Sequence, residues 1–315
     1  MANIVGATRP AVEGAGPASA SLLDTAPYRI GSVALVVRDL DALARFYREV
    51  VGLTTVSQEA DVVRLGVGAT VLLELRRDAA ARPWSPDEAG LYHTAFLLPS
   101  RGHLGAWLAH ARERGVRLSG ASDHVVSEAV YLDDPEGNGI EVYADRPSSA
   151  WPREPDGTIA LGRDRLDLAA LIQAASGPWA GMPQGGRVGH VHLQVGEIEL
   201  ADRFYAGLLG FDVMIRYPGA TFLGAGGYHH QLATNVWQSR GAGGRPAAMA
   251  GLAEVVLLAD APTLAAVRDR CRDAGLAPDA ADGALVLQDP WGTRFRLVPQ
   301  ADVCGGSEPT RIPAS

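Results

Sequence analysis

A repeat within the chain constrains its fold more than any other feature of the sequence. Residues 30–53 read IGSVALVVRDLDALARFYREVVGL, and residues 188–211 read VGHVHLQVGEIELADRFYAGLLGF. Both segments begin with alternating apolar residues, which is typical of a strand that buries one face. Both continue into an amphipathic stretch that contains an Arg-Phe-Tyr triplet and ends near a glycine, as a helix commonly does. The repeat therefore predicts two copies of a strand followed by a helix.

A second and fainter repeat follows each copy of the first. Residues 90–98 (GLYHTAFLL) correspond to 251–258 (GLAEVVLL), and residues 134–142 (DPEGNGIEV) correspond to 289–297 (DPWGTRFRL). Helical stretches around 103–114 and 262–274 lie between these segments. Each unit is therefore a strand, a helix and about three further strands. The four modules that this pattern predicts are residues 28–78, 90–146, 188–238 and 250–300.

These modules predict an α+β fold built from four βαβββ units. A single unit covers one face of its small sheet with a helix and leaves the other face bare, so two units can close into a cupped half-barrel. Four units then make two cups. In chain order we expect a first domain (28–146), a linker (147–187) with a short helix in LDLAALIQAA, and a second domain (188–300), with tails at 1–27 and 301–315.

The composition argues against several other classes of protein. The 315 residues are 47% hydrophobic and 20% charged, which is typical of globular proteins. A net charge of −8 without a basic cluster argues against a nucleic-acid partner, and no apolar run approaches the roughly 20 residues that span a bilayer. The N-terminal tail lacks a signal-peptide pattern, and Cys271 and Cys304 give no disulfide framework, which together predict a cytoplasmic protein. Exposed sheet edges are compatible with a homo-oligomer.

Residues 124–141 (HVVSEAVYLDDPEGNGIE) carry the densest group of chemically useful side chains. A turn rich in glycine and asparagine begins at Asp134 and separates two strands. On the second strand, alternation places Ile140 on the helix-covered face and Glu141 on the face of the cup. A carboxylate in that position is costly unless it is paired or binds a metal. Tyr131, on the first strand, lies close enough to share the same cavity.

Two histidines occupy matching places near the starts of other strands. Together with Glu141, His93 and His190 supply two neutral imidazoles and one carboxylate, the ligand set that holds non-haem Fe(II) and leaves positions open. We prefer His190 to His192 as a ligand because His190 aligns with His93 at the start of its module. His192 is then expected to line the pocket as a polar group.

The matching positions in the first and fourth modules lack this ligand set. His190, His93 and Glu141 correspond to Ser32, Glu254 and Arg296. Arginine cannot ligate a metal because its guanidinium stays protonated and has no free lone pair. We therefore expect modules two and three to share the cup that holds the metal, and modules one and four to form a structural cup. A rival set, Glu74 with His93 and Glu141, would form a glyoxalase-like site if modules one and two paired instead.

The same stretch resembles the signature of extradiol ring-cleavage dioxygenases. It contains His124, five residues, an aliphatic residue and Tyr131, then Asp-Pro, a glycine and a closing Glu141. Ser122, two residues before the histidine, departs from the residue types that the family prefers. With the modules of residues 28–300, the resemblance is to the vicinal oxygen chelate (glyoxalase/bleomycin resistance/extradiol dioxygenase) superfamily, among catechol-2,3-dioxygenase-like proteins.

The resemblance implies a reaction and a set of partners. It implies a catecholic substrate, O₂, and Fe(II) held by His93, His190 and Glu141, and Mn(II) suits the same ligands. It implies that His124 and Tyr131 hydrogen-bond the substrate. The ring would be cut beside its two hydroxyl groups.

The end of the third module leaves one assignment open. It reads GGYHHQ, where related proteins tend to have three histidines and this chain has Gln231 as the third residue. The resemblance favours His230 as the acid/base group. Strand alternation, with Leu232 facing the helix, favours His229 and lets only one of the two enter the cup. Of the two, we assign His230 as the acid/base group.

The fold by itself allows two other functions. One is a glyoxalase-like metal-dependent lyase or isomerase, and the other is a non-enzymatic protein that binds a small molecule such as an antibiotic.

Overall fold

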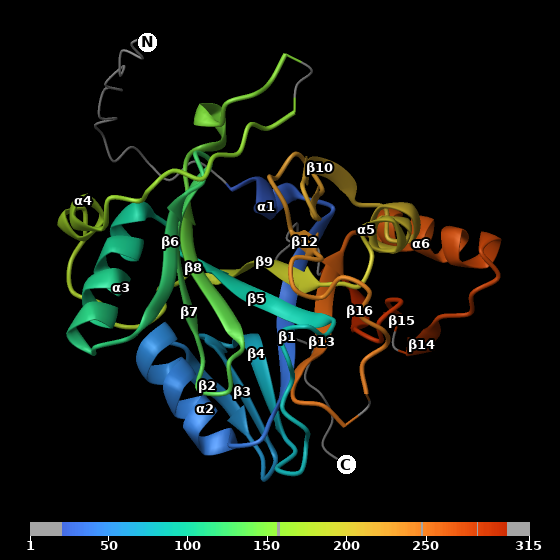
Figure 1. Ribbon diagram of the computed structural model, residues 1–315, viewed down its shortest axis with the longest axis horizontal. Helices are drawn as coiled ribbons and strands as arrows, with labels where there is room; N and C mark the ends of the chain where they lie inside the picture. Colours follow the sequence, from blue (N-terminus) through green and yellow to red (C-terminus); the bar gives the residue numbers. More distant parts are fainter. Residues whose placement is uncertain (1–20, 156–157, 247, 282, 301–315) are drawn as a thin grey trace, which may run out of the picture.

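The computed structural model describes residues 21–300 except 156–157, 247 and 282, and it contains two mixed eight-stranded sheets with helices packed against them (Figure 1). Each predicted module forms one strand, one helix and three further strands in that order, so the α+β class and the βαβββ pattern are confirmed. Module one contains β1 (Tyr28–Val37), α2 (Leu40–Phe46), β2 (Thr54–Gln58), β3 (Val62–Val67) and β4 (Thr70–Arg77). Module two contains β5 (Gly90–Leu97), α3 (Arg101–Glu113), β6 (Leu118–Asp123), β7 (Ser127–Asp133) and β8 (Gly139–Asp145).

The second half of the chain repeats this order. Module three contains β9 (Arg187–Gln194), α5 (Ile198–Asp202), β10 (Asp212–Tyr217), β11 (Ala220–Gly224) and β12 (Leu232–Asn235). Module four contains β13 (Gly251–Ala259), α6 (Ala261–Asp273), β14 (Asp279–Ala281), β15 (Ala284–Gln288) and β16 (Arg294–Pro299).

Each sheet joins one module from each half of the chain. The strand order is β14-β15-β16-β13-β1-β4-β3-β2 in the first sheet and β10-β11-β12-β9-β5-β8-β7-β6 in the second. The two modules of a sheet meet at an antiparallel pair of their first strands, β1 with β13 and β5 with β9. Modules two and three therefore share one cup and modules one and four share the other, as the positions of the candidate ligands predict.

The helices of the stronger repeat end near glycines. α2 continues into a π-helical turn (Tyr47–Val51) and α5 into another (Arg203–Leu208). Gly52 and Gly210 follow with φ of +87° and +86°, a left-handed conformation that glycine adopts at no steric cost. A Cβ at Gly52 would lie 2.7 Å from the backbone nitrogen of Met182, so the linker chain also packs closely on this helix end.

The tyrosine of each Arg-Phe-Tyr triplet joins its helix to the turn of the next module. Tyr47 Oη donates to Asp134 Oδ2 at 3.0 Å, and Tyr205 Oη donates to Asp289 Oδ2 at 2.7 Å. All four side chains are buried. Matching hydrogen bonds thus tie module one to module two and module three to module four, while the sheets tie the two halves together. The division into two consecutive domains stays a prediction.

The linker contains the short helix that its sequence predicts. This helix, α4 (Leu168–Gln173), packs on α3. The contact is close because a Cβ at Gly105 of α3 would lie 2.2 Å from the carbonyl oxygen of Leu171. A short 3₁₀ turn (Ser148–Ala150) begins the linker.

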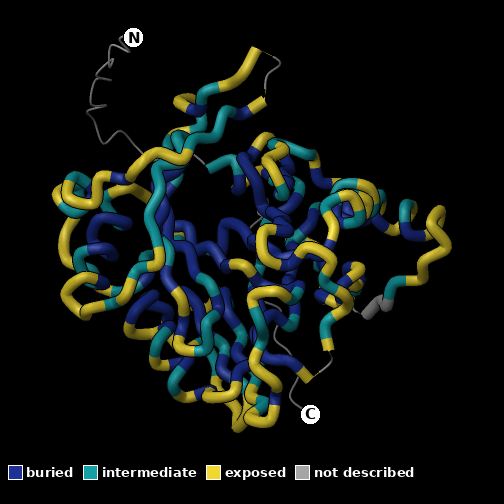
Figure 2. Tube along the Cα trace, in the orientation of Figure 1, coloured by how far each residue is buried: buried dark blue, intermediate teal, exposed yellow. Residues whose placement is uncertain are grey.

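The last residues of the expected N-terminal tail form a short helix, α1 (Leu22–Thr25), whose Leu23 is buried. The expected C-terminal tail, with Cys304, lies outside the described residues, and Cys271 is a buried free thiol. Figure 2 shows buried residues along the strands of both sheets and exposed residues on the loops. Within residues 21–300, as far as they are described, no helix is long and apolar enough to cross a membrane.

Candidate metal centre and substrate cavity

Three neighbouring strands of the second sheet bring the predicted ligands together. β5 lies between β8 and β9, and Ala95 on β5 is paired with Glu141 on one side and with His190 on the other. Side chains two residues apart share a strand face, so His93 points the same way as Ala95. Because the buried side chain of Ala95 is a single methyl group, it leaves room for the three larger side chains to converge.

The donor atoms form a triangle of the size that one metal ion needs. His93 Nε2 and His190 Nε2 lie 3.1 and 3.2 Å from Glu141 Oε2, and the two nitrogens are 3.3 Å apart. With metal–ligand bonds of about 2.1 Å, neighbouring ligand atoms lie about 3.0 Å apart at right angles and about 3.4 Å apart in a tetrahedron. This trio is a group in the described chain that could hold a metal ion, and its donors leave other positions open.

The charge of the trio also suits a divalent cation. Burial lowers the pKa of His190 to about 4, so its imidazole is neutral near neutral pH and keeps a free lone pair. Burial by itself opposes ionisation of Glu141, but interactions with His190 and His93 outweigh it and hold the pKa of the carboxyl well below 4.5. No lysine or arginine of the described chain forms an ion pair with Glu141. A buried carboxylate without a cationic partner is costly, and a bound metal would remove that cost.

The ring of His190 is held mainly by packing. It lies against the rings of Tyr143 and His230, with centroid separations of 5.0 and 4.2 Å, and its Nδ1 has no hydrogen-bond partner among the described residues. A Cβ at Gly189 would lie 1.8 Å from Tyr143 Oη. The glycine before His190 therefore admits the tyrosine that supports the ligand.

His124 and Tyr131 form a hydrogen-bonded pair on the cavity wall. His124 Nδ1 lies 3.1 Å from the carbonyl oxygen of Gly162, and since a carbonyl only accepts, Nδ1 carries the proton of the neutral ring. His124 Nε2 then accepts from Tyr131 Oη at 2.7 Å. Burial lowers the pKa of His124 and raises the pKa of Tyr131 well above 10, so both groups are neutral. The next residue, Val125, has φ of +72°, which is costly for a β-branched side chain.

The two histidines at the end of module three are both buried and bonded to each other. Residues 225–231 form a turn and not a strand, so the alternation expected there does not apply. His230 lines the cavity and His229 does not. His229 Nε2 donates to Asp145 Oδ1 at 2.9 Å, and the Nδ1 atoms of the two histidines are 2.8 Å apart. His229 Nδ1 is then the acceptor of this contact, and neutral His230 keeps its lone pair on Nε2.

Two further polar residues of this region have clear places. Gln231 is buried, and its side chain bonds the backbone of Ala225 and the carbonyl oxygen of Tyr28. It does not line the cavity, so the glutamine that stands in place of a third histidine holds the turn together. His192 lines the cavity, and its Nε2 lies 3.0 Å from the side-chain amide of Asn235.

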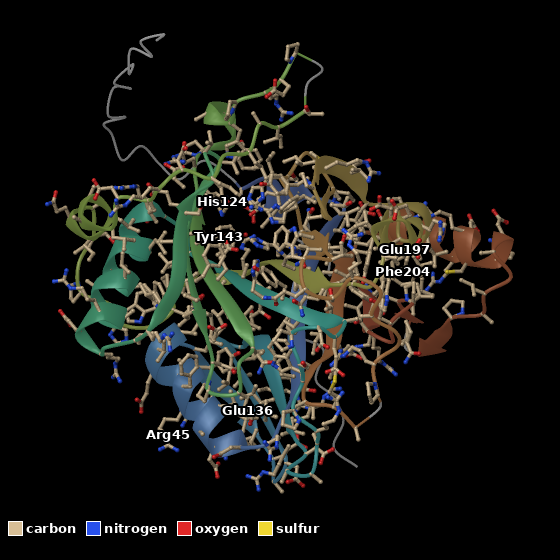
Figure 3. The ribbon with its side chains drawn as sticks, viewed as in Figure 1. Arg45, His124, Glu136, Tyr143, Glu197 and Phe204 are labelled. Carbon is tan, nitrogen blue, oxygen red and sulfur yellow. The ribbon has the colours of Figure 1, made fainter. Side chains whose placement is uncertain are left out.

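A cavity of about 660 Å³ opens beside the trio. The six residues to which the sequence analysis assigns a role in metal binding or catalysis all line this cavity. They come from β5, from β6–β8, from β9 and from the turn before β12, and they are His93, His124, Tyr131, Glu141, His190 and His230. Figure 3 labels His124 and Tyr143, which both belong to module two and the second sheet's side of the molecule. Other residues line the cavity that no sequence pattern had indicated, among them Tyr92, Arg163, Tyr217, Phe222 and Trp237.

Arg163 is in the linker, whose chain crosses the cavity beside β6. Backbone hydrogen bonds in both directions join Asp123, at the end of β6, to Asp164. No periodicity or motif in a linker indicates that it borders a site, which explains why sequence reasoning missed this wall.

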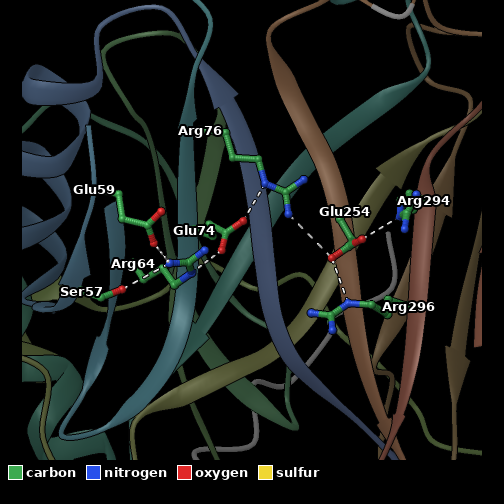
Figure 4. A network of polar contacts seen from close by, with 8 residues as sticks. All are labelled: Ser57, Glu59, Arg64, Glu74, Arg76, Glu254, Arg294 and Arg296. Atoms are coloured by element: carbon green, nitrogen blue, oxygen red, sulfur yellow. Dashed lines mark hydrogen bonds and ion pairs between the residues drawn. The ribbon is translucent and has the colours of Figure 1, made fainter. Parts of the chain in front are cut away.

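The equivalent place in the first sheet holds an ion-pair network and no ligand set (Figure 4). Glu254, at the position of His93, accepts from Arg294 Nε at 2.8 Å and from Arg296 Nε at 3.2 Å. Arg296 itself stands at the position of Glu141. The modular repeat thus carries metal ligands in one sheet and an ion-pair network in the other.

The rival ligand Glu74 belongs to this network. It lies on β4 of the first sheet, and its two carboxylate oxygens contact Arg64 Nε and Arg76 Nε at 2.6 Å each. His93 and Glu141 lie on the second sheet. The glyoxalase-like set that would combine Glu74 with them is therefore not assembled in this fold.

Comparisons with known proteins agree with this fold. The sequence-family model of the Glyoxalase/Bleomycin resistance protein/Dioxygenase superfamily matches residues 29–142 and 187–297, which are more than half of the chain. The chain therefore belongs to this superfamily. A catechol-2,3-dioxygenase from Bacillus subtilis (strain 168) is 37% identical over 268 residues, which cover 83% of this chain and 93% of the relative.

Solved structures share the fold at lower identity. A variant of glyoxalase I from Zea mays has a TM-score of 0.55 at 17% identity, with 89% of this chain and 97% of that chain covered. A protein from Bacillus subtilis subsp. subtilis strain 168 has a TM-score of 0.57 at 12% identity, with 86% of this chain and 84% of that chain covered.

Proposed function

We propose that this protein is an extradiol ring-cleaving dioxygenase that inserts both atoms of O₂ into a catecholic substrate at an Fe(II) site. The observation that carries the proposal is the buried triangle of His93, His190 and Glu141, which opens onto a cavity that His124, Tyr131 and His230 also line. The similarity to a catechol-2,3-dioxygenase along most of both chains supports the same reaction.

Fe(II) held by these three residues would supply Lewis acidity and open positions for a diol and O₂, and Mn(II) suits the same ligands. The protein's own contribution begins with positioning. Tyr131 is the direct cross-strand neighbour of Glu141, so its hydroxyl lies beside the metal ligands. Burial keeps this hydroxyl protonated by raising its pKa, so Tyr131 does not serve as a base. Because its one proton is donated to His124 Nε2, its oxygen is the acceptor of a hydrogen bond from a substrate hydroxyl. His124, held by Gly162, orients that hydroxyl.

His230 is the proposed acid/base group. Its lone pair is on Nε2, because its Nδ1 proton is bonded to His229 and the proton of His229 is bonded to Asp145. In the proposed reaction, His230 Nε2 accepts a proton from a substrate hydroxyl and returns it later as a general acid. The side chain of Asp145 is 17% exposed, so the chain of hydrogen bonds begins at the cavity and ends near solvent.

The test is oxygen uptake by protein loaded with Fe(II) under anaerobic conditions and then given a panel of small catechols. We expect O₂ consumption in proportion to a yellow ring-opened product, and neither from the Glu141→Gln variant. Metal binding without O₂ uptake on any catechol would favour a glyoxalase-like lyase or isomerase. Failure to bind metal would favour a protein that only binds a small molecule.

A further inference from the structure

The mouth of the cavity differs in chemistry from its inner end. His93, Glu141 and His190 are at most 6% exposed, whereas Tyr92 and Trp237 are 37% and 38% exposed. Tyr217, which also lines the cavity, is 44% exposed. These three aromatic residues are among the five large hydrophobic side chains of the described chain that are exposed, so most such surface gathers at this mouth.

Arg163 lies among these aromatic rings. Its guanidinium carbon is 4.2 Å from the ring centre of Tyr217 and 5.4 Å from that of Trp237. Rings that pack on the face of a guanidinium restrict its position and leave its N–H groups free at the edge. The stacking therefore holds a cation at the mouth without using its hydrogen-bond donors.

No described carboxylate neutralises this cation. Arg163 is in none of the ion pairs found among the described residues, although two carboxylates, Asp133 and Glu141, line the same cavity. The positive charge of Arg163 also acts on groups inside the cavity. Arg163 lines the cavity, and its positive charge adds to the effect of burial in lowering the pKa of His124. The side chain thus presents an unpaired positive charge to the ligand space.

The size of the cavity leaves room for a ligand that reaches this charge. About 660 Å³ is within the range of pockets that hold drug-sized molecules, so a bare catechol ring would leave much of it unfilled. A guanidinium edge matches a carboxylate in two parallel hydrogen bonds, and its single charge matches a monoanion.

We propose that Arg163 is a specificity residue that binds the carboxylate of a side chain on the substrate, so that the enzyme prefers catechols with a short carboxylate-terminated substituent over neutral ones. The catechol part of this inference rests on the proposed dioxygenase function. The anion site itself depends only on the arginine, the two rings that pack on it and the absence of a carboxylate partner in the described chain.

The first experiment compares dihydroxyphenylacetate with methylcatechol in the Fe(II)-loaded wild type and in Arg163→Met, Arg163→Lys and Arg165→Met. Arg165 is exposed, two residues along the same linker, and does not line the cavity, so its variant is the matched control. We expect Arg163→Met to raise KM for the carboxylate substrate about 5- to 10-fold, as for a partly exposed ion pair, with kcat and the neutral substrate unchanged. Arg163→Lys should restore part of the loss.

An equal effect of Arg163→Met on both substrates, or no effect on either, would overturn the proposal, since a merely structural arginine gives one of these results. The second experiment separates this proposal from the dioxygenase function. Titration calorimetry measures phenylacetate and phenylacetamide, neither of which has a diol. Tighter binding of phenylacetate that is lost in Arg163→Met supports the anion site even if no catechol is cleaved. Equal or undetectable binding of the two compounds contradicts it.

Discussion

Glu141 in the cup of the second sheet and Glu254 in the cup of the first sheet are both buried carboxylates. Replacing each with glutamine should show that one is needed for metal binding and the other for the stability of the fold. Glu141 is 3% exposed and faces two imidazoles, whereas Glu254 is 5% exposed and faces arginines. Glutamine keeps the shape of each side chain and removes its charge. We expect Glu141→Gln to abolish metal binding without loss of stability in metal-free protein, and Glu254→Gln to do the reverse.

The expected sizes of the two effects follow from the contacts. Glu254 accepts two charge-assisted hydrogen bonds, at 2.8 and 3.2 Å, from Arg294 and Arg296, whose side chains are 45% and 44% exposed and can return to water. Because both arginines are partly exposed, each ion pair contributes less than a fully buried one, and we expect Glu254→Gln to lower the free energy of unfolding by about 1–2 kcal/mol. A ligand at a concentration 100 times its Kd stabilises the folded state by about 2.7 kcal/mol, which raises Tm by about 5–10 °C in a chain of this size.

The assay is thermal unfolding of the wild type and both variants, with and without Mn(II), which avoids oxidation during the measurement. The wild type should show the metal-dependent rise in Tm. Glu254→Gln should have a lower starting Tm and the same rise, and Glu141→Gln should show no rise. A metal-dependent rise that survives Glu141→Gln, or that Glu254→Gln removes, would refute the assignment of the metal site to the second sheet.

Three further changes test other parts of the structure. His229→Phe keeps the ring that packs on its neighbours but removes the acceptor for His230 Nδ1, so kcat should fall about 100-fold with metal content unchanged, as measured by steady-state kinetics and metal analysis; an unchanged kcat would argue against the proton-transfer role. Burial raises the pKa of Asp134 from 3.8 to about 6, so its protonation favours the folded state, and this contribution is present at low pH and is lost as pH rises from about 4 to 6. Asp134→Asn should remove up to about 3 kcal/mol of that pH dependence in urea unfolding, and an unchanged slope would contradict the raised pKa. Gly105→Ala places a Cβ 2.2 Å from a backbone oxygen of α4 and should lower the free energy of unfolding by about 1–3 kcal/mol. An unchanged urea midpoint would show that α4 moves away from the new methyl group without loss of stability.

The modules and the ligand set could be predicted because their signals are local or repeated. Alternation and the repeated glycines mark the strands and helix ends, and the same alternation places Glu141 opposite Ile140. The pairing of modules two and three followed from the type of residue at equivalent positions, since Arg296 cannot replace Glu141 as a ligand. The structure brings these strands together in one sheet.

The mouth of the cavity could not be predicted, for physical reasons. Arg163 is in a linker without periodicity, and its neighbours Tyr217 and Trp237 come from separate segments of module three. Strand alternation could not decide between His229 and His230, because alternation describes strands and these residues lie in a turn. Their relation depends on a hydrogen bond to Asp145, which is distant in sequence.

The central claim is that both oxygen atoms of O₂ enter a catechol ring at the site of His93, His190 and Glu141. The most direct measurement is mass spectrometry of the product formed by Fe(II)-loaded protein under isotopically labelled O₂. We predict a ring-opened product that carries two labelled oxygen atoms, apart from exchange at its aldehyde, and no such product from Glu141→Gln. An isomerised or unchanged substrate without label, from protein that has bound its metal, would contradict the account.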